Sequence, residues 1–264
     1  MKITEKINNS RFTLKKILSD EWDTTVIPDY SPLEINKIYK DSDISMFFKK
    51  SYGHGFICNI KLQHKVISNY NLHIIYYNFP DLSPGAPKQK VTKSIAEKIK
   101  KLYENDYFST NDSVMTIISE PVSESIQKYI DNLNIEFQTD LEINGLNSDI
   151  LDGKDNIKCN LPSENLKLNQ DYNLKHFKNV HILDIDSLTN NLLEHKLVPK
   201  HEVIRNKEEI NKILDDCNAI ISQLPIILKN DIISKLIRLS PGDICKIKRI
   251  DNKCGEYNFY RICK

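Results

Sequence analysis

The sequence has few glycines and tryptophans, and it lacks the motifs and long apolar stretches that mark several classes of protein. It has 7 glycines and a single tryptophan. The Gly-rich phosphate-binding loops and the G-x-S-x-G nucleophile elbow are missing, and Gly53-His54-Gly55 is too short to cradle a phosphate and indicates a bend between strands. No stretch approaches the roughly 20 apolar residues that a membrane span needs. The sequence therefore offers no legible catalytic motif and no membrane segment.

The six cysteines are scattered and form no metal-binding pattern. No C-x-x-C pair occurs, and no histidine lies at zinc-ligand spacing from a cysteine pair. The opening residues, MKITEKINNSRF, lack the apolar core of a signal peptide, so we expect an intracellular protein. Thiols stay reduced inside cells. We therefore predict six free thiols, no metal and no other cofactor in this chain.

Charge is almost balanced. There are 37 basic and 36 acidic residues, which give a net charge of +1. A free-standing nucleic-acid binder usually carries a basic excess, so this balance argues against that class while it permits one local basic face. Hydrophobic residues make up 40% of the chain and charged residues 28%, which is ordinary for a globular protein of one large domain or two small ones.

Residues 1–135 alternate between strand and helix patterns, which predicts an α/β domain. The expected strands are 44–48, 55–62, 73–78 and 114–118. The expected helices begin at Ser10 (to about Asp20), at Thr92 and in the turn of Ser119 and Pro121. Their expected buried stripes are Leu14, Ile17 and Leu18; Ile95, Ile99, Leu102 and Tyr103; and Val122, Ile126, Tyr129, Ile130 and Leu133. The prolines and glycine at 80, 84, 85 and 87 indicate a loop.

The rest of the chain divides into three parts. Residues 136–176 are rich in Asn, Asp, Lys and Gly without apolar periodicity, and we interpret them as an insertion, part extended and part loop. Residues 177–191 are a connecting strand and linker. Residues 192–264 predict a small α+β domain, in which Asn206 and Asp231 cap two helices and 244–250 pairs with 256–263 in a hairpin.

Three blocks in this last domain carry a family resemblance. They are His195-x-Leu-Val-Pro-x-His201, Ser222-Gln-Leu-Pro225 and Gly255-x-Tyr-x-x-Tyr-Arg-Ile-Cys263. Together they resemble the C-terminal domain of the fifth-largest subunit shared by the eukaryotic nuclear RNA polymerases. In the archaeal RNA polymerase, the same domain forms a small subunit by itself.

The resemblance implies a non-catalytic subunit of a multisubunit DNA-directed RNA polymerase, monomeric within a hetero-oligomer. The C-terminal domain is expected to dock on the largest subunit, and the catalytic magnesium is expected on the largest subunits. The N-terminal domain is expected to be a jaw, with an inactive restriction-endonuclease-like fold, that flanks downstream duplex DNA through weak non-specific contacts.

Candidate contact residues follow from the same blocks and from the basic final strands. The two histidines at 195 and 201 are expected to be structural, each ring held by backbone hydrogen bonds. The candidate contacts with the largest subunit are His195, Leu197, Val198, Pro199, His201, Gln223, Leu224, Pro225, Arg249, Tyr257, Tyr260 and Arg261. The candidate DNA contacts are Ser119, Pro121 and Ser123, although Glu120 and Glu124 beside them repel DNA.

Departures from the family pattern indicate a divergent lineage. Ile226 stands where the family usually has Arg, Ile232 where it has Pro, and Ser240-Pro241 replaces a basic pair. Abundant Asn, Ile and Lys indicate an AT-rich genome. We favour a giant DNA virus, which would place the protein in the virion and host cytoplasm; a cellular member would be nuclear.

Two alternatives remain open. A live nuclease of this fold needs an acid followed by an acid-x-Lys on a strand; the nearest candidates are Asn59-Ile60-Lys61, where a neutral amide replaces the carboxylate, and Asp251-x-Lys253 in a hairpin loop. The other alternative is a regulator that binds the polymerase transiently.

Overall fold

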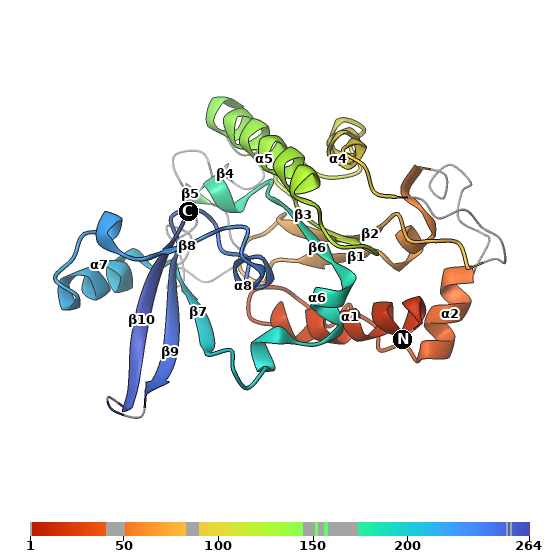
Figure 1. The fold of residues 1–264 in the computed structure, drawn as a ribbon. Helices are drawn as coiled ribbons and strands as arrows, with labels where there is room; N and C mark the ends of the chain where they lie inside the picture. The colour runs from red at the N-terminus through yellow and green to blue at the C-terminus, as the bar shows by residue number, and fades with distance from the viewer. Residues whose placement is uncertain are drawn as a thin grey trace. The chain divides into compact units, whose positions relative to one another are not determined.

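The computed structural model describes residues 2–40, 51–82, 90–144, 151–152, 156–157, 174–251, 253 and 255–264 (Figure 1). They fall into two units: an N-terminal unit from residues 1–160 and 177–190, and a C-terminal unit from residues 161–176 and 191–264. The expected strand 44–48 and loop positions 84, 85 and 87 lie outside the described residues. Within the described part of the chain, no helix is long and apolar enough to cross a membrane.

A four-stranded sheet forms the centre of the N-terminal unit, in the order β1 (Ile60–Gln63), β2 (Asn71–Tyr77), β3 (Ser113–Ile118) and β6 (Val180–Asp184). The last three strands run parallel, and β1 is antiparallel to β2. Strand β3 is buried along its whole length, as parallel strands covered on both faces are. The mixed α/β architecture is as predicted, and β6 joins this sheet although β4, β5 and residues 158–173 precede it in the chain.

Helices cover both faces of this sheet (Figure 1). On one face lie α4 (Ser94–Glu104) and α5 (Glu124–Asn144). On the other lie α1 (Ile3–Ile17), α2 (Pro32–Lys40) and α6 (Ile185–Thr189). The apolar stripe predicted for α4 is confirmed, because Ile95, Ile99 and Leu102 are buried in the core.

Helix boundaries in this unit correct several expectations. Helix α1 begins seven residues before Ser10, whose hydroxyl instead donates to the carbonyl of Ile7 at 2.7 Å and lies 2.9 Å from the Tyr76 hydroxyl. A serine hydroxyl can bond backward within a helix as well as cap one. The expected strand from Gly55 is in its first half a 3-10 helix, η1 (His54–Cys58).

Gly53, expected in a bend between strands, instead precedes the 3-10 helix η1 in a backbone conformation that requires glycine. Its φ is +85°, in the region that favours glycine, and a Cβ there would lie 2.8 Å from the Cα of Asn78.

Helix α5 also differs from the prediction at both ends. It begins at Glu124, so Ser119 and Pro121 precede the helix instead of forming its first turn. It continues to Asn144, so the predicted extended and loop structure is wrong for residues 136–144. Tyr129, which we expected on the buried face, is 40% exposed. Beyond α5, the described part of the predicted insertion contains β4 (Leu151–Asp152) paired with β5 (Asn156–Ile157), then η3 (Leu174–His176).

The C-terminal unit is the predicted α+β module. Its sheet runs β7 (Lys200–Ile204), β9 (Ile244–Asp251), β10 (Gly255–Cys263) and β8 (Ile226–Ile227), with short 3-10 turns η4 (Leu192–Glu194) and η5 (Ile221–Gln223) before β7 and β8. Helix α7 (Lys207–Asp216) contributes Ile213 to one core cluster. The residues that follow α8 (Ile232–Leu236) contribute to the other cluster.

The capping residues identified in the sequence correctly predicted where α7 and α8 begin. The Asn206 side chain accepts from the backbone N–H of Glu209 at 3.0 Å, and that of Asp231 accepts from Ile233 at 2.8 Å. Each bond satisfies an amide that the first turn leaves without an intrahelical partner. Both predicted caps are confirmed.

A buried ionic cluster fastens η3 to the turn before β9. The carboxylate of Asp243 lies 3.2 Å from His176 Nε2 and 3.5 Å from Arg205 Nε, and it accepts from the N–H of Ser240 at 2.9 Å. The Ser240 hydroxyl lies 3.1 Å from His176 Nδ1. Serine, histidine and aspartate meet here, but each is at most 5% exposed. No substrate can reach them, so the cluster is structural.

Candidate assembly surface

One face of the C-terminal sheet gathers basic and aromatic side chains. Alternate residues of a strand share a face, and the register sets His201 and Phe259 on either side of Ile247 and Arg249 opposite Tyr257. Arg261 lies two residues beyond Phe259 on the same strand. We call this set the basic-aromatic face: His201, Arg249, Tyr257, Phe259 and Arg261.

The two arginines of this face flank one aromatic ring. The Cζ atoms of Arg249 and Arg261 lie 4.4 Å and 5.5 Å from the centroid of the Phe259 ring. Arg261 Nη1 also donates to the carbonyl of Ile226 at 3.2 Å. Cation–π contacts hold a guanidinium against a ring while its N–H edges stay available. No carboxylate among the described residues pairs with either arginine, so the face presents forked donors that fit a carboxylate of a partner.

The opposite face of the same sheet carries lysines with a carboxylate among them. Glu202 lies 2.7 Å from Lys200 Nζ and 3.4 Å from Lys246 Nζ. The hydrogen bond from Lys200 is the largest of the effects that lower the pKa of Glu202. The two faces therefore differ in kind: ion-paired lysines on one, and arginines held against an aromatic ring on the other.

Both histidines of the first sequence block are held by backbone groups, as predicted. His195 Nδ1 accepts from the N–H of Leu197 at 3.2 Å, and His201 Nδ1 lies 2.6 Å from the carbonyl of Pro199. Burial lowers the pKa of His201, and the nearby Arg249 and Arg261 lower it further, against the hydrogen bond to Pro199 and the charge of Asp231, which raise it. The net lowering favours the neutral ring, which does not compete with the arginines for an anion.

Other candidate contacts from the sequence lie in different environments. Leu224 is 7% exposed in the core, and Tyr260 packs against the core cluster beneath α7 on the opposite face, so neither is presented with the arginines. Gln223 accepts from the N–H of Ile220 at 2.9 Å and stays exposed, as does Pro225. Leu197 is 83% exposed in the loop before β7, where Val198 and Pro199 are half-buried.

Two exposed apolar residues that we had not proposed as contacts lie in and just after the neighbouring strand β8, where the register pairs Ile226 with Ile262. Ile226 is 48% exposed and Leu228 is 65% exposed, and the carbonyl of Ile226 is bonded to Arg261. Phe259 packs against the core cluster that contains Ile247 and Cys245, as expected, and its half-buried ring also contacts both arginines.

The predicted DNA-contact residues lie before α5 in the N-terminal unit. The Ser123 hydroxyl accepts from the N–H of Ile126 at 3.4 Å, so Ser123 caps the helix. The Ser119 hydroxyl donates to the carbonyl of Asn78 at 3.5 Å. Glu120 accepts from the N–H of Val91 and lies among these residues, where its charge opposes a phosphate.

The nuclease-like tripeptide sits where we expected it, at the start of β1. The side-chain carbonyl of Asn59 accepts from the N–H of Tyr76 at 2.8 Å, so the amide braces β2. Among the described residues, no group of three His, Cys, Asp or Glu side chains is placed to hold a metal ion. Four cysteines, at 58, 217, 245 and 263, are free. Burial raises the pKa of Cys58 and of Cys245 to about 11, which keeps both thiols protonated and unreactive.

Comparison with known proteins assigns the C-terminal part of the chain to a class. Residues 190–263 match the family model described as RNA polymerase Rpb5, C-terminal domain. The chain is therefore a non-catalytic subunit of a multisubunit DNA-directed RNA polymerase, an enzyme whose active site lies on the largest subunits.

Relatives identify the family. The chain is 41% identical over 73 residues to the DNA-directed RNA polymerase subunit Rpo5 of Methanosphaera stadtmanae, which covers 28% of this chain and 94% of that protein. It is 47% identical over 68 residues to Rpo5 of Sulfurisphaera tokodaii, covering 26% and 80%. It is 40% identical over 73 residues to the RNA polymerases I, II, and III subunit rpabc1 of Dictyostelium discoideum, covering 28% and 36%. The chain belongs to the Rpb5 family of RNA polymerase subunits, as the three sequence blocks predicted.

Proposed function

We propose that the C-terminal unit anchors the chain to the largest polymerase subunit through the basic-aromatic face. The observation that carries this proposal is the arrangement of Arg249 and Arg261 on either side of Phe259 without a carboxylate partner among the described residues. Arginine and aromatic residues dominate the binding energy of protein interfaces. Exposed Ile226 and Leu228 supply apolar area at the neighbouring strand β8. The partner surface should therefore carry carboxylates next to an apolar patch.

Charge reversal tests this anchoring. The double variant R249E/R261E should lower recovery of the largest subunit with the tagged chain by at least tenfold, since each lost hot-spot arginine weakens binding by about 2 kcal/mol or more. A matched control is K212E/K248E, which makes the same change of charge on α7 and on the opposite sheet face. Equal recovery with both variants would refute the assignment of the face.

We also propose that the N-terminal unit acts as a jaw with a restriction-endonuclease-like fold beside downstream DNA. Its support is the resemblance in the C-terminal unit, together with hydroxyls at Ser119 and Ser123 near the start of α5. A photo-crosslinking residue at position 123 of the assembled enzyme should label downstream duplex. Position 135, on the same helix and 62% exposed, is the control. Labelling of position 135 but not of position 123 would show that DNA does not contact the start of α5.

One purification tests both whether the chain is a stable polymerase subunit and whether it comes from a virus or a cell. We propose a stable subunit of a viral polymerase, present in the virion and host cytoplasm, on the support of the AT-rich composition. Affinity purification from the native source should recover the two largest subunits in a one-to-one ratio, and their sequences identify the virus or the host. Substoichiometric recovery would favour a transient regulator. Metal-dependent cleavage of plain duplex by the isolated chain would favour the nuclease.

A further inference from the structure

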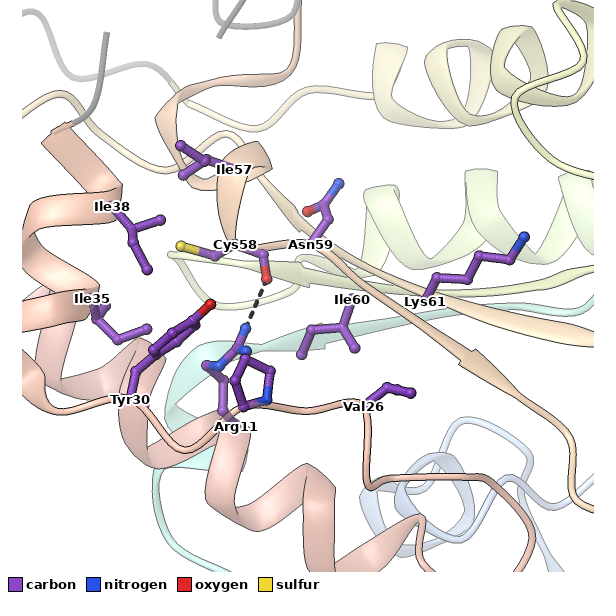
Figure 2. Close-up of a pocket in the computed structure, with 11 residues that line it drawn as sticks. Arg11, Val26, Tyr30, Ile35, Ile38, Ile57, Cys58, Asn59, Ile60 and Lys61 are labelled. Carbon is purple, nitrogen blue, oxygen red and sulfur yellow. Dashed lines mark hydrogen bonds between the residues drawn. The ribbon is translucent and has the colours of Figure 1, made fainter. Parts of the chain in front are cut away.

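A cavity of about 240 Å³ lies in the N-terminal unit, between α1, α2 and the start of β1 (Figure 2). Its lining contains no Asp or Glu. Part of its lining is apolar, from Val26, Pro28, Ile35, Ile38, Ile57 and Ile60. Arg11, Tyr30, Cys58, Asn59 and Lys61 complete the lining. The volume is that of about eight water molecules in the liquid, which is enough for a small organic molecule.

Arg11 is the buried cation of this cavity. The residue is 6% exposed, and Figure 2 shows its side chain reaching from α1 toward Cys58. Its Nη1 donates to the carbonyl of Cys58 at 3.1 Å, and its Cζ lies 5.2 Å from the centroid of the Tyr30 ring. Among the described residues it has no carboxylate partner, and its Nε, which is also buried, has no hydrogen-bond acceptor.

A buried guanidinium without a counter-charge is unfavourable, because removal from water is only partly offset by one carbonyl and one ring face. Proteins normally pair such a group with an anion. Small-molecule sites combine apolar walls with a few fixed polar groups in this way. We propose that this cavity binds a small organic carboxylate. The Arg11 guanidinium takes the carboxylate, and the isoleucines at 35, 38 and 60 enclose the apolar part.

The lining favours a carboxylate over inorganic phosphate. A phosphate offers its acceptors in every direction, and those that face the isoleucines of the lining are left without donors. A carboxylate concentrates its charge at one end and matches the planar guanidinium. The ligand binds without covalent chemistry, since burial raises the pKa of the Cys58 thiol to about 11 and keeps it neutral.

Calorimetric titration of the full chain tests the proposal with butyrate as the probe. Butyramide has the same shape without the charge, and inorganic phosphate has the charge without the apolar part. Butyrate should bind one to one, at least about tenfold more tightly than butyramide or phosphate, because a charged hydrogen bond adds this much. R11M should remove the preference for butyrate over butyramide, and K37M, which removes an exposed cation of α2 outside the cavity, should keep it.

A purely structural Arg11 gives different results. In that case butyrate and butyramide would bind equally weakly, and R11M would destabilise the chain through loss of the Cys58 and Tyr30 contacts. Under the proposal, R11M without ligand is at least as stable as the parent chain, since an apolar side chain replaces an uncompensated charge. If R11M does not fold, R11K replaces it in the test. Lysine keeps the positive charge but lacks the two parallel N–H donors of the guanidinium, so butyrate should bind several-fold more weakly. Unchanged butyrate binding by R11K would overturn the proposal.

Discussion

Replacement of Asp243 by alanine should unfold the C-terminal unit selectively. The Asp243 carboxylate is 3% exposed and lies 3.2 Å from the buried His176 ring and 3.5 Å from the buried Arg205 guanidinium, whose charge it compensates. It also accepts from the N–H of Ser240, which closes the turn into β9. Its removal leaves a guanidinium without a counter-charge and an amide without an acceptor. Breaking a buried pair in this way costs about 3–5 kcal/mol.

Urea unfolding of the full chain measures this loss. With a slope of about 2 kcal/mol per molar urea, the midpoint for the C-terminal unit should fall by roughly 2 M. The single tryptophan, Trp22, is buried in the N-terminal unit, so its fluorescence reports that unit, and circular dichroism reports both. Asp216→Ala, an exposed carboxylate of the same unit, is the control and should move neither transition by more than a few tenths of a molar. A shift below about 0.5 M for Asp243→Ala would refute the assignment of the cluster as a stabilising one.

The pH dependence gives the same cluster a second test. Burial alone would raise the pKa of Asp243, but His176, Arg205 and the Ser240 amide together outweigh burial and hold that pKa below its usual 3.8. A depressed folded-state pKa means that the contribution is complete above pH 3.8 and is lost as pH falls through the lower folded value. The parent chain should therefore lose stability on acidification below that pH more steeply than Asp243→Ala. Parallel acid titrations of the two chains would contradict this.

Three further substitutions follow from single contacts. Asp112→Ala should destabilise the N-terminal unit by about 3 kcal/mol, since the buried carboxylate lies 2.8 Å from His73 Nε2, and Trp22 fluorescence should report it. An unchanged midpoint would contradict the pairing. Asn206→Ala should cost about 1 kcal/mol, measured as faster hydrogen exchange at the start of α7, and an effect at its end alone would contradict the cap. Ile213→Ala should cost about 2–5 kcal/mol in urea unfolding of the C-terminal unit, because the side chain is 6% exposed, and a loss under 1 kcal/mol would show that α7 packs loosely.

The helix starts and the turn of the C-terminal unit were predictable from sequence because the hydrogen bonds that define them join residues only a few positions apart. Asn206 and Asp231 cap helices through bonds to amides two or three residues away, and the turn before β9 closes over four residues. The N-terminal unit lacks such signals at its first helix. Helix α1 begins after Lys2, which carries no side-chain acceptor, while Ser10 offered a capping pattern and is bonded inside the helix. The Ser10 hydroxyl can either cap a helix or bond to a carbonyl within one, and the sequence alone does not show which bond forms in the folded protein.

The register of the sheet was the other information missing from the sequence. The block that ends at Cys263 contains Tyr257, Tyr260 and Arg261; strand alternation separates Tyr260 from the other two but does not show which face packs against α7. Pairing of β10 with β9 places Tyr257 and Arg261 on one face, and the odd step to Tyr260 turns that side chain toward the core beneath α7. Conversely, Arg249 comes from a different strand and joins the face only through its pairing opposite Tyr257. A surface built across strands is thus visible only after the strands are paired.

Isoleucine at position 226, where the family usually has arginine, can be understood from the contact that Arg261 makes there. The Arg261 guanidinium is bonded to the backbone carbonyl of Ile226 and not to its side chain, so the position of Arg261 does not depend on which residue stands there. The side chain at 226 therefore affects what the partner meets more than how the face is built. An isoleucine that is 48% exposed, beside Leu228 at 65%, replaces a charge with apolar area. Under the proposed anchoring, the largest subunit should keep acidic residues opposite Arg249 and Arg261 and have an apolar surface opposite Ile226.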